Sequence, residues 1–141
     1  MAFRMMTEIG IIAQLANNQM ERSLPDGLKM SQFGVLHHLV RLGGSWSPAR
    51  LANAFQVTKG AMTNSLQRLE KRRLVQIKAD PDDGRGKLVS ITGAGVKMRT
   101  RCIENISPLL VDLATDISAA NISQVLPVLE KLRKHLDTRR S

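Results

Sequence analysis

Three helix-start signals follow one another closely in the first half of the chain, and they leave few folds open. Each is a hydroxyl side chain that can accept hydrogen bonds from the first N–H groups of a helix: Ser31, Ser47 and Thr58. Pro48 strengthens the second signal, because proline fits the first position of a helix. Gly43-Gly44 ends the first helix, since glycine accepts the left-handed backbone common at helix ends. We therefore expect three short helices joined by tight turns.

The helix that begins at Thr58 and runs to about Arg73 has two different faces. Apolar or small residues recur on one face with helical spacing: Met62, Ser65, Leu66 and Leu69. The other face is polar and basic: Lys59, Gly60, Thr63, Asn64, Gln67, Arg68 and Lys71. The first face is expected to pack on a core, and the second is expected to be exposed.

Two segments, 74–79 and 87–91, come directly after this helix. Apolar and polar residues alternate in both segments, as they do in strands with one buried face. The connecting residues 80–86 contain proline and glycine, which favour turns. This pattern predicts a β-hairpin with a long tip, on which Arg85 lies between two glycines.

Helical patterns also occupy the C-terminal part of the chain. Thr92 is expected to cap a long helix with a heptad-like seam. Apolar residues repeat every seven positions at Val96, Ile103, Leu110 and Ile117, and Ile106 and Leu113 supply the offset position. Pro108 lies inside this helix and should bend it. Asn121 is expected to cap a last helix, with Pro127 near its start.

A further helix is expected at the other end of the chain, over residues 7–22 with Thr7 as its cap. Its apolar stripe is broad for a single partner. Together with the two C-terminal helices it gives three apolar stripes that one subunit could not easily cover, which favours a homodimer.

These elements predict a mainly α fold with a small β-hairpin wing: a winged helix-turn-helix with a helical dimerisation region. We expect residues 1–141 to form a single domain. Residues 28–91 would be the winged helix-turn-helix DNA-binding part. Residues 1–25 and 92–141 would be the helical dimerisation part.

The chain is strongly basic, with 21 Lys+Arg against 12 Asp+Glu and a formal net charge of +9. This balance favours an anionic partner, either nucleic acid or an anionic membrane surface. Aromatic residues make up only 3 %, which argues against base-stacking readers of single strands or RNA. One cysteine excludes an intrachain disulfide framework and a cysteine-based zinc finger. With no membrane-length apolar run and no secretion signal, a cytoplasmic location without membrane association is expected.

The exposed face of the helix after Thr58 suits duplex DNA, because the major groove admits one helix. Asn64 and Gln67 can pair with adenine edges. Lys59 or Arg68 can bind guanine or phosphate. The expected DNA contacts are Ser47, Thr58, Lys59, Gly60, Ala61, Thr63, Asn64, Gln67, Arg68, Lys71, Arg85 and Lys87.

Two cationic features have alternatives. Arg85 at the hairpin tip suits a narrow minor groove, whose negative potential attracts a single arginine. Lys71-Arg72-Arg73 could be only a solvated helix end, since cations suit a helix C-terminus. Because the chain also has a wing and a positive net charge, we expect at least one of these three residues to face phosphate.

Five stretches of the central region carry a family signature: Leu51-Ala52, Val57-Thr58, residues 69–75, Asp83-Gly84-Arg85-Gly86 and residues 89–95. They resemble the MarR family of bacterial transcription regulators, and the matching region covers roughly residues 31–95. The resemblance implies an obligate homodimer whose interface is formed by the first helix and the last two. It also implies that Asp83 orients Arg85 rather than touching DNA. The chain departs from the family at Arg73, where glycine is common, and in its acidic wing, with Asp80, Asp82 and Asp83.

By this resemblance the chain is a sequence-specific regulator of transcription that binds double-stranded DNA. It would act as a ligand-responsive repressor on a palindromic operator. The effector would be a small molecule, such as an aromatic acid or a phenol, bound between the dimer helices and the DNA-binding part. The alternative is a winged-helix module for non-specific DNA binding or for protein binding. No enzyme is expected, because the chain lacks phosphate-loop, zinc-hydrolase and nucleophile motifs, and no cofactor is expected.

The remaining reactive side chains have ordinary structural interpretations. Cys102 is expected to be a buried thiol, with a redox role as the alternative. His37 and His38 are adjacent on a helix, so their side chains diverge by about 100° and do not easily face one metal. No metal site is therefore expected.

Overall fold

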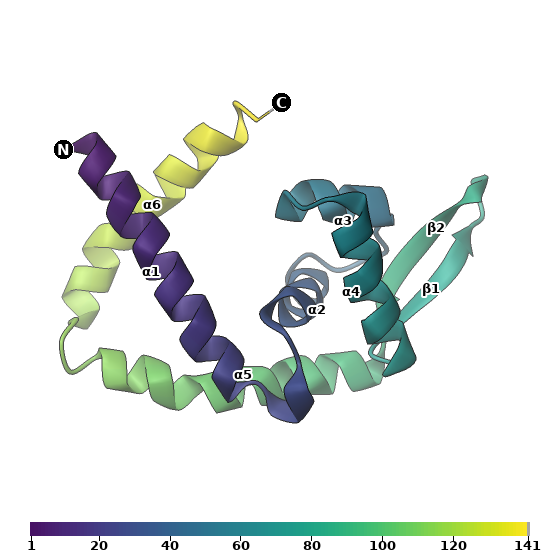
Figure 1. Cartoon of the computed structure of the whole chain (residues 1–141), viewed down its shortest axis with the longest axis horizontal. Coiled ribbons are helices and arrows are strands. Elements are labelled where there is room, and N and C mark those ends of the chain that lie inside the picture. The colour runs from purple at the N-terminus through teal and green to yellow at the C-terminus, as the bar shows by residue number, and fades with distance from the viewer. Residues whose placement is uncertain (141) are drawn as a thin grey trace. The chain divides into compact units, whose positions relative to one another are not determined.

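The computed structural model describes residues 1–140, and these residues form α-helices, one short 3-10 helix (η1) and a two-stranded antiparallel hairpin (Figure 1). The elements in chain order are α1 (Ala2–Ser23), η1 (Pro25–Gly27), α2 (Met30–Leu42), α3 (Pro48–Phe55), α4 (Lys59–Lys71), β1 (Val75–Asp80), β2 (Asp83–Ile91), α5 (Gly93–Leu113) and α6 (Ala119–Asp137). The expected fold class is confirmed. The chain divides into two compact units, Met1–Ile106 and a second that begins at Ser107.

The hydrophobic core of the first unit lies among α2, α3, α4, the hairpin and the part of α5 up to Ile106. Its largest fully buried side chains are Leu28, Leu36, Leu39, Leu51, Leu66, Leu69, Val35, Val89 and Cys102. Burial of each leucine or valine contributes about 1.5–3 kcal/mol relative to exposure. The core therefore fixes α4 by its inner face and leaves its outer face to solvent.

The start signals of α3 and α4 are confirmed. The Ser47 side chain accepts a hydrogen bond from the Arg50 N–H at 3.2 Å, and Thr58 Oγ1 accepts one from the Ala61 N–H at 3.1 Å. The glycine stop also holds, because Gly43 is the C-cap of α2 with φ of 70°. The helix-turn-helix α3–α4 is thus set by local sequence.

The expected starts of α1 and α2 are wrong. α1 begins at Ala2, and the Thr7 hydroxyl donates to the Phe3 carbonyl oxygen inside the helix instead of capping it. α2 begins at Met30 rather than after Ser31. The reason is tertiary, since Glu21 Oε1 of α1 accepts the Met30 N–H at 2.8 Å.

α6 also begins earlier than expected. Ser118 is its cap, accepting the Asn121 N–H at 3.1 Å, while Asn121 Oδ1 accepts the Ser118 N–H at 3.2 Å. Asn121 is therefore the third helical residue, in a reciprocal capping box, and not the cap itself. Pro127 consequently lies well inside the helix rather than near its start.

The cap of α5 is confirmed, because Thr92 Oγ1 accepts the Gly95 N–H at 3.0 Å. The heptad stripe is not the core face of this helix. Val96, Ile103 and Leu110 are exposed, and Ile117 lies beyond the end of α5 at Leu113. The buried face is offset from that stripe and consists of Gly95, Met98, Cys102 and Ile106.

The hairpin has a shorter tip than expected, because β1 extends to Asp80 and β2 begins at Asp83. The register pairs Ile77 with Val89 and Ala79 with Lys87, and then shifts near the tip. A third segment joins the hairpin. Trp46 pairs with Val89 through two backbone hydrogen bonds of 2.8 and 2.9 Å. A single paired residue has no alternation pattern, so the sequence offered no signal for it.

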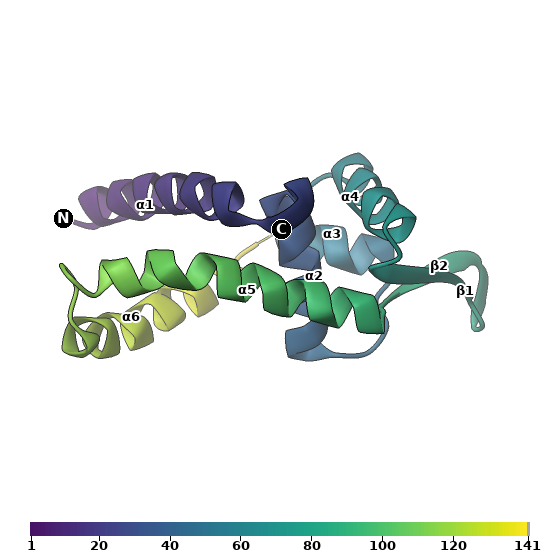
Figure 2. The ribbon, with the colours of Figure 1, turned by 90° about the horizontal axis from the view of Figure 1, so that it is seen from below.

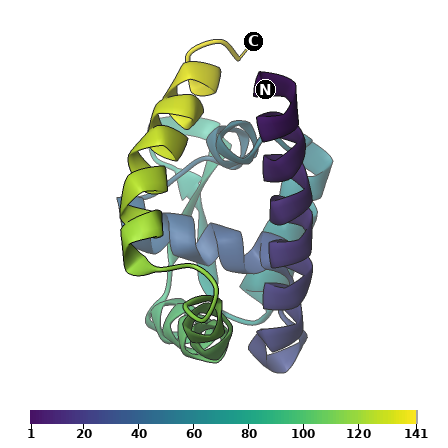
Figure 3. The ribbon, with the colours of Figure 1, turned by 90° about the vertical axis from the view of Figure 1, so that its left-hand side faces the viewer.

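Two helices bury little apolar surface within their own unit. α1 holds no buried residue, and in Figures 2 and 3 it is a long rod leading to η1. Its exposed large apolar side chains include Phe3, Ile11, Ile12 and Leu15. In the second unit α6 also has no buried residue and exposes Ile122, Val125, Leu126, Val128 and Leu129.

Candidate nucleic-acid interface

The outer face of α4 is exposed from end to end. Met62, Leu66 and Leu69 are buried on the inner face and Ser65 is half-buried, as expected. The exposed residues of α4 include one acidic side chain, Glu70; the others are Lys59, Gly60, Ala61, Thr63, Asn64, Gln67, Arg68 and Lys71. Apart from the local helix backbone, no atom of residues 1–140 lies within 4 Å of the position that a Cβ on Gly60 would take, so the backbone there is open to a partner. Figures 1 and 2 show α4 at the surface of the first unit, beside the hairpin.

Asn64 and Arg68 are already joined on this face. Arg68 Nε donates a hydrogen bond to Asn64 Oδ1 at 3.2 Å, one helical turn apart. Bidentate pairing of Asn64 with adenine needs both its oxygen and its nitrogen, and the oxygen has a second lone pair that can accept from adenine while the Arg68 bond is kept. Asn64 therefore offers its N–H donors and one remaining acceptor lone pair.

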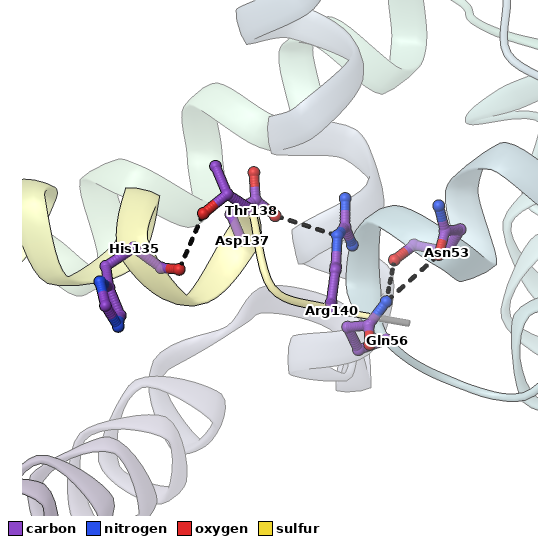
Figure 4. Close-up of polar contacts among 6 residues, drawn as sticks. All are labelled: Asn53, Gln56, His135, Asp137, Thr138 and Arg140. Carbon is purple, nitrogen blue, oxygen red and sulfur yellow. Dashed lines mark hydrogen bonds and ion pairs between the residues drawn. The ribbon is translucent and has the colours of Figure 1, made fainter.

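The turn between α3 and α4 is held by Gln56, which has a positive φ of 54°. Its Nε2 donates to the Asn53 carbonyl oxygen at 2.7 Å and lies 3.3 Å from Asn53 Oδ1 (Figure 4). The Gln56 contacts stabilise the left-handed residue that sets the direction of α4.

In the second unit, the same close-up shows Thr138 bonded to the His135 carbonyl oxygen and Arg140 paired with Asp137.

The caps of the two helices retain donors toward solvent. Ser47 and Thr58 use their side-chain oxygens as acceptors, which leaves each hydroxyl hydrogen able to donate. Lys87 is exposed on β2, opposite Ala79. Each of these expected contacts therefore presents a donor or a charge at the surface, and their contact with DNA remains a prediction.

The wing tip positions Arg85 through its backbone. The pairing of Asp80 with Asp83 follows directly on that of Ala79 with Lys87, so residues 84–86 bulge out of the ladder. Arg85 is exposed in this bulge, and its N–H donates to Asp83 Oδ1 at 3.1 Å. A Cβ on Gly86 would lie 3.2 Å from Asp83 Oδ2, so glycine leaves room for that carboxylate.

Arg73, the departure from the family pattern, has a left-handed backbone with φ of 61°. Its N–H donates to the Glu70 carbonyl oxygen at 2.8 Å, and the Leu74 N–H donates to that of Leu69 at 3.0 Å. These two bonds are a Schellman motif, in which glycine is usual. The conformation is thus kept although the residue is arginine.

The histidines lie in different surroundings on α2. His38 is buried beside the rings of Trp46 and Phe55, at centroid distances of 4.5 and 5.2 Å. Its Nε2 has no hydrogen-bond partner among residues 1–140. Burial lowers the pKa of His38, and nearby Arg41 lowers it further. A neutral ring is therefore favoured.

His37 stacks on Phe33 at 5.6 Å, and Arg99 Nη2 lies 3.3 Å from its Nδ1. Burial lowers the pKa of His37, and Arg99 adds to the effect. Among residues 1–140, no three His, Cys, Asp or Glu side chains form a group that could hold a metal ion.

Cys102 is fully buried, as expected for a structural thiol. Burial raises the pKa of this thiol, and the opposing effect of Arg101 is smaller. A reactive cysteine needs exposure and a lowered pKa. The environment of Cys102 has neither.

Within residues 1–140, none of the helices has the length and apolar character that a membrane span needs.

The paired helices α3 and α4, the hairpin and the exposed basic face of α4 define a winged helix-turn-helix protein. A model described as MarR family matches residues 26–86. The chain is 26 % identical over 136 residues to the multiple antibiotic resistance protein MarR of Escherichia coli, covering 92 % of this chain and 94 % of that protein. These findings support a MarR-family transcriptional regulator.

Solved structures agree with this assignment. A mutant of Escherichia coli MarR complexed with operator DNA has a TM-score of 0.71 and 26 % identity, covering 92 % of this chain and 96 % of that one. The transcriptional regulator BldR from Sulfolobus solfataricus has a TM-score of 0.84, with 95 % of each chain covered. At 24 % identity the latter supports the fold alone.

Proposed function

We propose that this protein regulates transcription by binding double-stranded operator DNA, with α4 in the major groove and the wing at the flanking minor groove. The observation that carries the proposal is the exposed polar and basic face of α4, fixed by a buried inner face and followed by Arg85 on the wing bulge. The similar MarR protein solved with operator DNA supports it. Nothing in this arrangement calls for an enzyme, and a bacterial regulator of this kind works in the cytoplasm.

The regulator is proposed to act as a homodimer. In the first unit, Ile11, Ile12 and Leu15 of α1 are each about half exposed, between 49 and 58 %. In the second unit, Val125 and Leu126 of α6 are similarly exposed. Apolar patches of this extent mark interfaces, and a second copy of the chain would cover them. Two-fold symmetry then requires a palindromic operator with half-sites ~34–36 Å apart.

We further propose that a small effector controls this binding and that the protein represses its target. A dimer on one rigid duplex must hold its two α4 helices at a fixed separation. A ligand that stabilises another separation would therefore release the DNA. Repression and an aromatic or phenolic effector come from the family resemblance.

The test measures binding to the DNA directly upstream of the protein's own gene, using fluorescence anisotropy across a salt series. We expect affinity at least ~10³-fold above that for a random duplex of equal length. The variants Asn64→Ala and Arg85→Ala should weaken binding while the dimer persists in sedimentation. A non-specific or protein-binding module would be favoured if the two duplexes bind equally and a genomic screen also finds no preferred DNA site.

A further inference from the structure

A basic hollow of about 480 Å³ lies between α4, η1 and the start of α2. Four cations, three side-chain amides and one glycine line it: Lys29, Arg68, Lys71, Arg72, Gln32, Asn64, Gln67 and Gly27. No carboxylate lines it. Pockets for apolar effectors are lined mainly by hydrophobic side chains, so this hollow is built for another class of ligand.

Three acidic residues lie near the lining residues in sequence, and none of them lines the hollow: Glu21, Asp26 and Glu70. The Glu21 carboxylate accepts the Met30 N–H at 2.8 Å, and Asp26 Oδ2 pairs with Arg101 at 3.1 Å. Neither residue lines the hollow. No carboxylate in the lining therefore neutralises its positive charge.

Two guanidinium groups are held in place at this site. Arg72 Nη2 donates to the Asp26 carbonyl oxygen at 2.8 Å, and Arg68 Nε donates to Asn64 Oδ1 at 3.2 Å. Each arginine has five N–H donors, so each keeps others for an anion. Orientation by one bond and donation by the rest suits phosphate oxygens.

The hollow continues the exposed face of α4. Asn64, Gln67, Arg68 and Lys71 follow one stripe of that helix at spacings of three and four residues. When a helix lies in the major groove, the phosphodiester backbone runs along its flank. Lys29 and Gln32 line the hollow on the side of α2, so they would then face that backbone.

We propose that this hollow binds the phosphodiester backbone of one operator strand, with Lys29 and Arg72 as phosphate-binding residues added to the α4 contacts. The inference rests on the proposed DNA-binding function and extends it to a second element, the N-terminus of α2. The Lys71-Arg72-Arg73 run had signalled a phosphate contact in the sequence, whereas nothing in the sequence pointed to Lys29.

The first experiment measures operator binding of Lys29→Gln, Arg72→Gln and the double variant across a salt series. The control is Lys97→Gln, which removes an exposed cation of α5 that does not line the hollow. Each single variant should lower the salt slope by about 1 for every phosphate that the removed cation neutralises, and the double variant should weaken binding by about 10-fold. The preference for operator over random duplex should stay unchanged, because phosphate contacts carry no sequence information.

The second experiment locates the phosphate. Operator duplexes carry one neutral methylphosphonate at successive positions, and each is combined with wild type and Lys29→Gln in a double-mutant cycle. We expect one backbone position at which the two changes are not additive. Additivity at every position, with an unchanged salt slope, overturns the inference.

The two proposals fail in different ways. If Asn64→Ala and Arg85→Ala weaken operator binding but the Lys29 and Arg72 variants do not, the hollow is not a phosphate site and the regulator function stands. If wild type does not distinguish the operator at all, the proposed function itself fails.

Discussion

The Thr92 hydroxyl donates a hydrogen bond to the carbonyl oxygen of Arg73 at 2.7 Å. The hydroxyl oxygen of Thr92 also accepts the Gly95 N–H and so caps α5, while the Thr92 N–H donates to the Leu74 carbonyl oxygen at 3.1 Å. One residue thus joins the end of α4 to the start of α5. The helix proposed to read DNA and a helix proposed to form the dimer are coupled at this point.

Thr92→Val should lower the free energy of unfolding by about 1–3 kcal/mol, because it removes a helix cap and a tertiary hydrogen bond while keeping the side-chain shape. Thr92→Ser keeps the hydroxyl and should recover most of the loss. Urea unfolding followed by circular dichroism measures both variants. Equal stability of the valine and serine variants would show that the two hydrogen bonds are not what Thr92 contributes.

Arg73→Gly should raise the free energy of unfolding by about 0.5–1 kcal/mol. The left-handed φ of 61° strains any residue with a Cβ, whereas glycine adopts it freely, at some cost in chain entropy. Arg73→Ala retains the strain and loses only the guanidinium, so it serves as the matched control. A gain of the same size in both variants would point to charge rather than backbone conformation.

The central helices and the hairpin were predictable because their signals are local. Ser47, Thr58 and Thr92 cap the helices that follow them, and α4 buries the face that its spacing indicated. The wrong starts had tertiary or reciprocal causes. α2 is capped by a carboxylate nine residues away in sequence, and Asn121 is only one partner in a capping box.

The candidate site likewise has one part that the sequence predicted and another part that it did not. The exposed residues of α4 follow from helical periodicity alone. The hollow beside α4 exists because the chain after η1 brings Lys29 to the same hollow as Arg72. These residues are far apart in sequence, so no sequence spacing predicts that they line one site. The heptad positions of α5 are apolar, as the sequence indicated, but Val96, Ile103 and Leu110 are exposed and do not belong to the buried face of the helix.

Gly95→Ala should prevent folding or lower the free energy of unfolding by more than about 4 kcal/mol. A Cβ there would collide with the Leu74 carbonyl oxygen and lie 2.6 Å from Ile91 Cγ1, and the first of these is backbone that cannot turn away. Gly93→Ala is the control, because a Cβ at Gly93 meets nothing within 4 Å. It should be neutral or slightly stabilising, since alanine favours helix. The comparison is made by thermal and urea unfolding, and a mild effect at Gly95 would mean that α5 can move away from Leu74.

Stability should fall as the pH is lowered from about 7.5 to about 5, the range in which histidine titrates. Burial lowers the pKa of both His37 and His38 in the folded protein below the ordinary value of 6.5. Below that value the unfolded chain binds protons that the folded chain does not, so protonation favours unfolding until the folded pKa is reached. Most carboxylates titrate below this window, which leaves the histidines as the main contributors.

The test is urea unfolding of wild type, His37→Gln and His38→Leu at several pH values in that window. Each variant should flatten the pH dependence, and both together should remove most of it. His38→Leu should cost little at the upper end of the window, because His38 Nε2 has no hydrogen-bond partner to lose within residues 1–140. A pH dependence that persists in the double variant would assign the effect to other groups.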